Sequence, residues 1–224
     1  SLFALAPPSD AFTSRGTWRS ETIDFFGWSG SVALFGFQGR DRLQGGDGND
    51  WVEGGQDDDW LYGRGGSDVL WGGAGADYMQ GGAGADTFIF LRGEVGRSGI
   101  FAHNGQEPDI IGDFNPSQGD VIEFYGFAGL AWTIEDSYSN DGTFIRFEDG
   151  SYLQLDYVAP AVIRANPGCI RFVNGPAPVA AEASGTAAIR VFADLTVPEG
   201  ASQTFDQGGA YIFSEPERPV GSLF

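Results

Sequence analysis

Aspartate recurs at every ninth position through the glycine-rich part of the chain, and this spacing is the clearest chemical signal in the sequence. The six residues are Asp41, Asp50, Asp59, Asp68, Asp77 and Asp86. Carboxylates are hard oxygen ligands, and Ca2+ takes about six to eight oxygens from carboxylates and backbone carbonyls. Glycine-rich turns leave such carbonyls accessible. The spacing therefore indicates a series of sites for divalent cations.

Each of these aspartates belongs to a row of nine residues. From Gly36 the rows read GFQGRDRLQ, GGDGNDWVE, GGQDDDWLY, GRGGSDVLW, GGAGADYMQ and GGAGADTFI. The eighth position is always apolar, and its residues are Leu43, Val52, Leu61, Leu70, Met79 and Phe88. The six residues that begin a row favour a turn, and the next three favour a short strand whose middle side chain points inward. The preceding row, GWSGSVALF, has Val32 in place of aspartate, which predicts a degenerate first coil.

Two rows make one coil, with their strands on opposite faces, so alternate aspartates stack in columns. One column is Asp41, Asp59 and Asp77, and the other is Asp50, Asp68 and Asp86. Adjacent strands lie about 4.8 Å apart, so each column crowds like charges together. A divalent cation between neighbouring turns would relieve this repulsion. The sequence therefore predicts an all-β fold, a parallel β-roll of stacked coils.

The rows resemble the RTX (hemolysin-type) calcium-binding nonapeptide GGxGxDxUx. They are most similar to the C-terminal RTX module of serralysin-type proteases and alginate epimerases. The resemblance implies several Ca2+ ions, held by the row aspartates and by the backbone carbonyls of the second and fourth positions. Those positions include Gly39, Gly46, Gly48, Gly55, Asp57, Gly66, Gly73, Gly75, Gly82 and Gly84. Asp57 and Arg64 stand where the pattern has glycine, and we expect weaker sites there.

The segment DIIGDFNPSQGDVIEF, which follows the rows, resembles the part that closes RTX rolls. The resemblance implies a further calcium site formed by Asp109, Asp113 and Asp120. The next stretch, TFIRFEDGSYLQLDYV, alternates apolar and polar residues around Asp149-Gly150, which is typical of a hairpin of capping antiparallel strands.

Three regions are expected from this pattern. Residues 1–26 are expected to form an N-terminal arm, and residues 27–158 the RTX roll with its cap. Residues 159–224 are expected to contain a Pro/Ala-rich connector and a C-terminal β element, or a tail used in secretion or assembly.

Composition excludes several classes of function. The formal net charge is −19 and the chain has no lysine, which argues against nucleic-acid binding. No apolar run reaches the roughly 20 residues needed to cross a bilayer, and the first residues do not read as a signal peptide. The single cysteine, Cys169, permits no intrachain disulfide and is expected to be a buried apolar residue. The single histidine, His103, has neither a nucleophile elbow nor the spacing of a metal ligand, so we expect no catalytic residues and no enzymatic activity.

Positions seven and nine of each row are expected to face outward. They include Trp60, Tyr62 and Tyr78 in one set of rows, and Trp51, Val69, Trp71 and Ile89 in the other. Exposed aromatic side chains are typical of contact surfaces, so we expect cover by the chain's own flanks or contact with a second subunit, with polysaccharide binding as the alternative.

Two functional interpretations follow. The first is a non-catalytic structural or adhesive protein that folds on binding calcium, outside the cell, on a cell surface or in an extracellular particle such as a virion. The second is a detached C-terminal targeting module of an exported protease or polysaccharide-modifying enzyme, secreted by type I machinery. Each interpretation places the protein outside the cytosol, where calcium is abundant.

Overall fold

The computed structural model describes residues 11–95, 108–136, 142–175, 202–205 and 211–214. The chain divides into two units, Ser1–Ala187 and Ala188–Phe224. In the second unit the described residues form one antiparallel pair of strands, β16 (Ser202–Phe205) and β17 (Tyr211–Ser214). His103 and the Pro/Ala-rich residues 176–201 lie outside the described residues.

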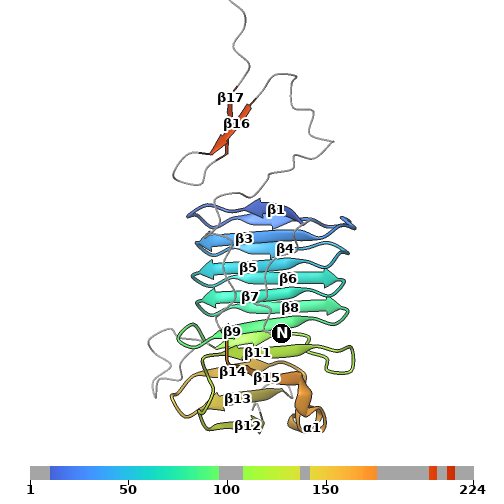
Figure 1. Cartoon of the computed structure of the whole chain (residues 1–224), viewed down its shortest axis with the longest axis vertical. Helices are drawn as coiled ribbons and strands as arrows, with labels where there is room; N and C mark the ends of the chain where they lie inside the picture. The colour runs from blue at the N-terminus through green and yellow to red at the C-terminus, as the bar shows by residue number, and fades with distance from the viewer. Residues whose placement is uncertain (1–10, 96–107, 137–141, 176–201, 206–210, 215–224) are drawn as a thin grey trace, which may run out of the picture. The chain divides into compact units, whose positions relative to one another are not determined.

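The first unit is a roll of two sheets, and the chain passes from one sheet to the other at each turn (Figure 1). The seven-stranded sheet has the order β1 (Phe12–Arg15), β3 (Val32–Gln38), β5 (Trp51–Gln56), β7 (Val69–Ala74), β9 (Thr87–Leu91), β11 (Val121–Tyr125) and β15 (Ile170–Val173). The eight-stranded sheet has the order β12 (Trp132–Asp136), β13 (Thr143–Phe147), β14 (Tyr152–Leu155), β10 (Asp109–Ile111), β8 (Tyr78–Ala83), β6 (Trp60–Gly65), β4 (Arg42–Gln44) and β2 (Thr22–Asp24).

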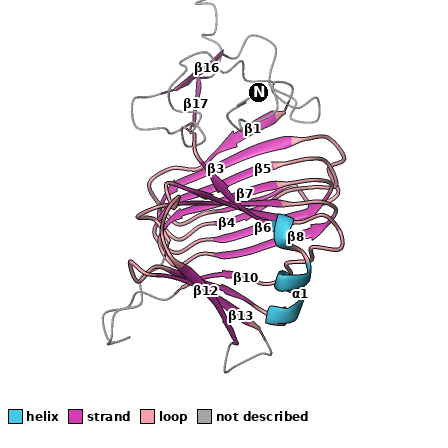
Figure 2. Ribbon diagram, turned by 60° about the horizontal axis from the view of Figure 1, so that its bottom comes forward, coloured by secondary structure: helices cyan, strands magenta, loops and turns pink. Residues whose placement is uncertain are grey.

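All strand pairs of the roll are parallel, and only β12, β13 and β14 pair in antiparallel fashion at one end. The short helix α1 (Pro160–Ala165) lies against β12 at this end (Figure 2). It is followed by a 3-10 turn, η1 (Pro167–Cys169). The predicted all-β fold, a parallel roll capped by antiparallel strands, is confirmed.

Residues 18 positions apart stand side by side, as Val52 and Leu70 do between β5 and β7. Each row position therefore stacks on itself along the roll. The apolar eighth positions fill the interior between the sheets, and all six side chains are 0% exposed. This burial is the main apolar contribution of each short strand, because neighbouring side chains point away from the interior.

The outer face of the seven-stranded sheet carries a second buried cluster, which corrects one expectation. Trp51 and Trp71 were expected to be exposed, but they are 1% and 7% exposed. The Trp71 indole donates a hydrogen bond of 3.0 Å from Nε1 to Glu94. On the eight-stranded sheet the expectation is correct for Trp60, which is 38% exposed.

Two segments expected to lie outside the roll contribute strands to it. From the expected N-terminal arm, β1 pairs with β3 and β2 pairs with β4. From the expected connector, β15 pairs with β11. Apolar side chains explain this difference, since Phe12, Ile23 and Phe172 all pack against the core, and Phe172 stacks on Phe124 at a centroid distance of 5.7 Å.

Cys169 is buried, as expected. None of the helices in the described ranges is long and apolar enough to cross a membrane.

Candidate metal centre

The glycine that opens each row leaves the space that the aspartate of the same row occupies. A Cβ atom added to Gly54 would come within 3.0 Å of Asp59 Oδ2 and of the carbonyl oxygen of Gly72, on the next turn. A Cβ at Gly63 would meet Asp68 Oδ2 and the Gly81 carbonyl in the same way. Each turn therefore folds its carboxylate back over its own first residue, next to a carbonyl of the following turn.

The departures from glycine keep the backbone shape of the repeat. Arg64 and Asp57 adopt left-handed φ angles of +83° and +74°, while Gly73 and Gly66 at equivalent positions have +97° and +110°. A left-handed conformation strains a residue that has a Cβ atom. The backbone carbonyls of these two turns are thus still presented as in a glycine turn.

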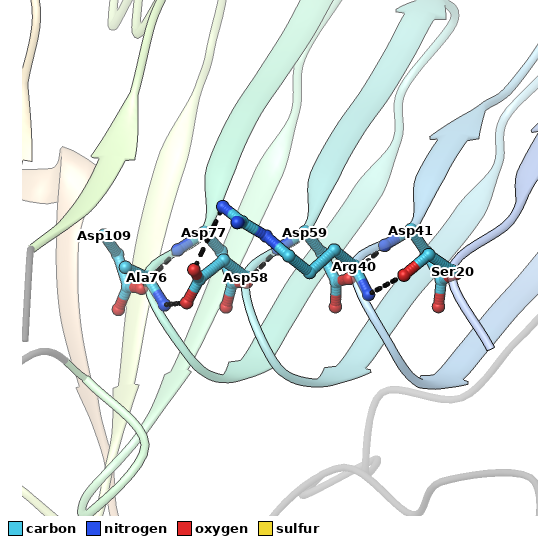
Figure 3. A network of polar contacts seen from close by, with 8 residues as sticks. All are labelled: Ser20, Arg40, Asp41, Asp58, Asp59, Ala76, Asp77 and Asp109. Carbon is cyan, nitrogen blue, oxygen red and sulfur yellow. Dashed lines mark hydrogen bonds and ion pairs between the residues drawn. The ribbon is translucent and has the colours of Figure 1, made fainter. Parts of the chain in front are cut away.

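Backbone amides tie the aspartates into two columns, one along each edge of the roll. In the first column, the amide of each acidic residue donates to Oδ1 of the next (Figure 3). The pairs are Glu21 to Asp41 at 2.7 Å, Asp41 to Asp59 at 2.7 Å, Asp59 to Asp77 at 2.9 Å and Asp77 to Asp109 at 3.0 Å. The second column runs from Val32 to Asp50 at 2.9 Å, Asp50 to Asp68 at 2.8 Å, Asp68 to Asp86 at 2.9 Å and Asp86 to Asp120 at 3.1 Å.

The second carboxylate oxygen is buried and has no hydrogen-bond partner in five of these aspartates. They are Asp41, Asp59, Asp68, Asp77 and Asp86. Asp50 differs, because its Oδ2 accepts a hydrogen bond of 2.7 Å from the Gly46 amide. A buried carboxylate oxygen without a partner is costly, and a divalent cation would satisfy it. The donor chemistry of the columns therefore fits Ca2+.

Carboxylates alone do not complete such sites. Among the described residues, no group of three or more acidic, histidine or cysteine side chains could hold a metal ion. Backbone carbonyls supply the remaining oxygens. They stack at the second and fourth positions, where a Cβ at Gly73 would meet the Gly55 carbonyl and a Cβ at Gly84 would meet the Gly66 carbonyl.

The other predicted glycines follow the same arrangement, with two exceptions. A Cβ at Gly75 would meet the Asp57 carbonyl, and a Cβ at Gly82 would meet that of Arg64. The Gly48 carbonyl likewise faces Gly66. The Gly46 carbonyl instead accepts a hydrogen bond of 3.1 Å from the Gly65 amide. Gly39 lies against the backbone of Arg19 and Ser20, on the first turn.

Burial raises the pKa of the column aspartates, and neighbouring carboxylates add to the effect. The pKa rises to about 8 for Asp59 and Asp68 and to about 7 for Asp77. For Asp41 and Asp86 it rises to about 6. Desolvation by burial is the largest cause in each case, so without a cation the column interior holds protonated or strongly destabilised carboxyl groups.

The three acids of the closing segment do not form one site. Asp109 continues the first column and Asp120 continues the second, on the opposite edge. Asp113 accepts hydrogen bonds of 3.0 and 2.9 Å from the amides of Gly81 and Gly82, so it closes the last turn of the second column. The expectation of one site with all three residues is therefore not met, because β10 and β11 belong to different sheets.

Glu21 was not predicted. It precedes Asp41 in the first column, but lies 20 residues before it rather than 18. A search at a fixed period of nine therefore passes over it, and only its polar setting before an apolar residue, Ile23, hints at the role.

Fold and site together define a parallel β-roll whose glycine turns carry buried aspartates. The family model described as RTX calcium-binding nonapeptide repeat (four copies) matches residues 35–70 and 54–88. Residues 35–88 are thus RTX repeats, which are calcium-binding repeats. No curated protein matches the chain.

Several solved structures are similar to this chain. The solution structure of the AlgE6R3 subunit from the Azotobacter vinelandii mannuronan C5-epimerase has 27% sequence identity and a TM-score of 0.48, and the match covers 85% of this chain and 99% of that one. The AlgE6R2 subunit of the same epimerase has 24% identity and a TM-score of 0.42, with 76% and 97% covered. The extracellular lipase LipA from Serratia marcescens has 17% identity and a TM-score of 0.33, with 71% and 40% covered.

Proposed function

We propose that neighbouring aspartates of each column hold Ca2+ between consecutive turns. The shared pairs are Asp41 with Asp59, Asp59 with Asp77, Asp50 with Asp68, and Asp68 with Asp86. The observation that carries the proposal is the set of buried Oδ2 oxygens without partners, each beside the glycine that opens its row. Bound Ca2+ would neutralise the paired carboxylates and accept the nearby carbonyl oxygens as ligands.

We infer that calcium binding and folding of the roll are one event. Each row buries one apolar side chain, worth about 1.5–3 kcal/mol. Ordering the backbone of nine residues costs about 1–2 kcal/mol per residue, and the raised pKa of the aspartates adds a further cost at neutral pH. Calcium bound only by the folded roll shifts the equilibrium toward it.

A calcium titration followed by circular dichroism tests both points. The β signal should rise with calcium, and the transition should be reversed by a chelator. Mass spectrometry of the native protein counts the bound ions. A calcium-free protein with full β signal and a cooperative melt would overturn the coupling, and a folded protein without bound ions at millimolar calcium would overturn the sites.

We propose a non-catalytic structural or adhesive role outside the cell for this roll. The charge of −19 and the two aspartate columns suit an environment rich in calcium, and no catalytic set of residues accompanies them among the described residues. The alternative is a detached targeting module of an exported enzyme. The length of the complete gene decides between these, because only the alternative requires a catalytic domain encoded in the same reading frame.

We propose the outer face of the eight-stranded sheet as the contact surface for a protein partner, a second copy included. Trp60 is exposed, and Tyr62 lies beneath the Arg42 guanidinium at 4.5 Å. Aromatic and arginine side chains are typical anchors of protein interfaces. Sedimentation of calcium-loaded protein tests this role: Trp60→Ala should reduce association, whereas Tyr157→Ala, at another exposed ring, should not. Protection of Trp60 fluorescence by soluble glycans would favour polysaccharide instead.

A further inference from the structure

Residues 16–24 are a degenerate row of the same repeat. They read GTWRSETID, with glycine first, glutamate sixth and Ile23 in the apolar eighth position. β2 pairs with β4 in matching register, with Thr22 opposite Arg42 and Ile23 opposite Leu43. Ile23 packs against the interior core as the other eighth positions do. Two extra residues, Phe25 and Phe26, then precede the next row and break the period.

Glu21 occupies the place that aspartate has in the other rows. Its amide donates to Asp41 Oδ1 at 2.7 Å, as the Asp41 amide donates to Asp59 Oδ1. Its Oε2 accepts from the Thr17 amide at 2.8 Å, just as Asp50 Oδ2 accepts from the Gly46 amide at 2.7 Å. The longer glutamate side chain thus brings its carboxylate back over the first turn.

The oxygens beside Gly16 repeat the pattern of the column sites. A Cβ at Gly16 would lie 2.7 Å from Glu21 Oε2 and 2.6 Å from the Gly36 carbonyl oxygen of the next turn. A Cβ at Gly36 would meet the equivalent pair, Asp41 Oδ2 and the Gly54 carbonyl oxygen. A carboxylate of one turn and a carbonyl of the next therefore converge here as they do further along the roll.

The start of the other column lacks this arrangement. Its sixth position is Val32, and a Cβ at Gly27 would meet no atom within 4 Å. Asp50, the first aspartate of that column, has both carboxylate oxygens bound by amides. Asp41, by contrast, is fully buried, reaches the Glu21 turn through Oδ1 and keeps an Oδ2 without a partner.

No arginine neutralises Glu21 in the described part of the chain. Arg40, which lies nearby, forms an ion pair of 3.1 Å with Asp58 instead. The Thr17 hydroxyl donates to Glu21 Oε1 at 2.6 Å. An ionised carboxylate offers about four acceptor positions, so each of its oxygens can still bind a cation.

We propose that Glu21 and Asp41 hold one further divalent cation of the Ca2+ type, between the first two turns of the first column. This inference rests on the proposed calcium sites of the roll and adds a site that the other column lacks. Glu21 is only half-buried, so this site exchanges with solvent more readily than the interior sites.

Native mass spectrometry at saturating calcium tests the proposal with the whole chain. Glu21→Gln should bind one calcium ion fewer than the unchanged protein, while Glu148→Gln, which removes an exposed carboxylate from the cap, should bind the same number. Circular dichroism at the same calcium concentration verifies that each variant folds. An unchanged ion count in folded Glu21→Gln overturns the proposal.

A crystal structure of the unchanged protein with Tb3+ as an anomalous probe covers the case in which Glu21→Gln does not fold. A peak between Glu21 and Asp41 supports the site. Peaks between Asp41 and Asp59 and further along the columns, with none at Glu21, overturn this inference alone. No peak in either column overturns the proposed calcium sites and this inference with them.

Discussion

Replacing Asp68 by asparagine should change the stability of the roll in opposite directions with and without calcium. Asp68 is fully buried, and its Oδ1 accepts the Asp50 amide at 2.8 Å, whereas its Oδ2 has no partner. Asparagine keeps the shape of the side chain and the acceptor for Asp50. It removes the charge and places an NH2 group where the proposed cation would bind.

The size of the calcium-free effect follows from the pKa of Asp68, which burial raises from 3.8 to about 8. At pH 7 the unfolded side chain is ionised, while the folded one binds a proton. Binding that proton at pH 7, well above the unfolded pKa of 3.8, costs about 4 kcal/mol at about 1.4 kcal/mol per pH unit. Asparagine does not ionise, so the calcium-free variant should be more stable by up to about 4 kcal/mol.

With calcium the same change should weaken the roll. Asp68 belongs to two proposed sites, with Asp50 on one side and Asp86 on the other. A lost charge-assisted contact costs about 1.5–3 kcal/mol, which raises the calcium midpoint by about 10- to 100-fold.

Urea unfolding followed by circular dichroism, in chelator and in saturating calcium, measures both effects. Asp47→Asn is the matched control, since Asp47 is an exposed carboxylate in a neighbouring turn and should show neither effect. A variant of Asp68 that is less stable in both conditions would refute the reasoning, because Asp68 would then act only through its hydrogen bond to Asp50.

Three further predictions concern pH, turn space and the cap. The raised pKa of Asp59 and its column neighbours means that the calcium-free roll is most stable below about pH 4 and loses this stability as pH rises through about 6 to 8, which circular dichroism in chelator measures; calcium affinity should rise over the same range as protons are released. Gly63→Ala should cost about 1–3 kcal/mol in urea unfolding, because its Cβ meets the buried carboxylate of its own row, whereas Gly168→Ala has no neighbour within 4 Å and should change little. Phe172→Ala should cost about 2–4 kcal/mol in calcium, since its ring stacks on Phe124; an unchanged melting temperature would show that β15 adds no stability.

The repeating part of the fold could be predicted from the sequence because one nine-residue pattern specifies turn, strand and site together. The eighth positions, such as Leu61, lie in the core as the pattern predicts. The terminal strands could not be predicted in this way. β1 and β15 have neither the glycines nor the aspartate of a row, and they join the roll through apolar contacts such as those of Phe12 and Phe172.

The column ends show the same limit. Glu21 escapes a search at period nine because two phenylalanines lengthen its row. Asp109 and Asp120 were predicted as one site, since they are close in sequence, but the strand that each precedes joins a different sheet. Residues distant in sequence thus share a column, and residues close in sequence do not.

The register of 18 residues between neighbouring strands also sets which changes in chain length the roll tolerates. Removing or duplicating 18 residues, one full coil such as 54–71, returns every later strand to its own sheet and every aspartate to its own column. A change of nine residues moves all later strands to the opposite sheet. Trp71 would then leave its buried cluster for the face of Trp60, and each column would continue with the aspartates of the other. The natural unit by which such a roll lengthens or shortens in evolution is therefore the pair of rows, although the sequence repeats with half that period.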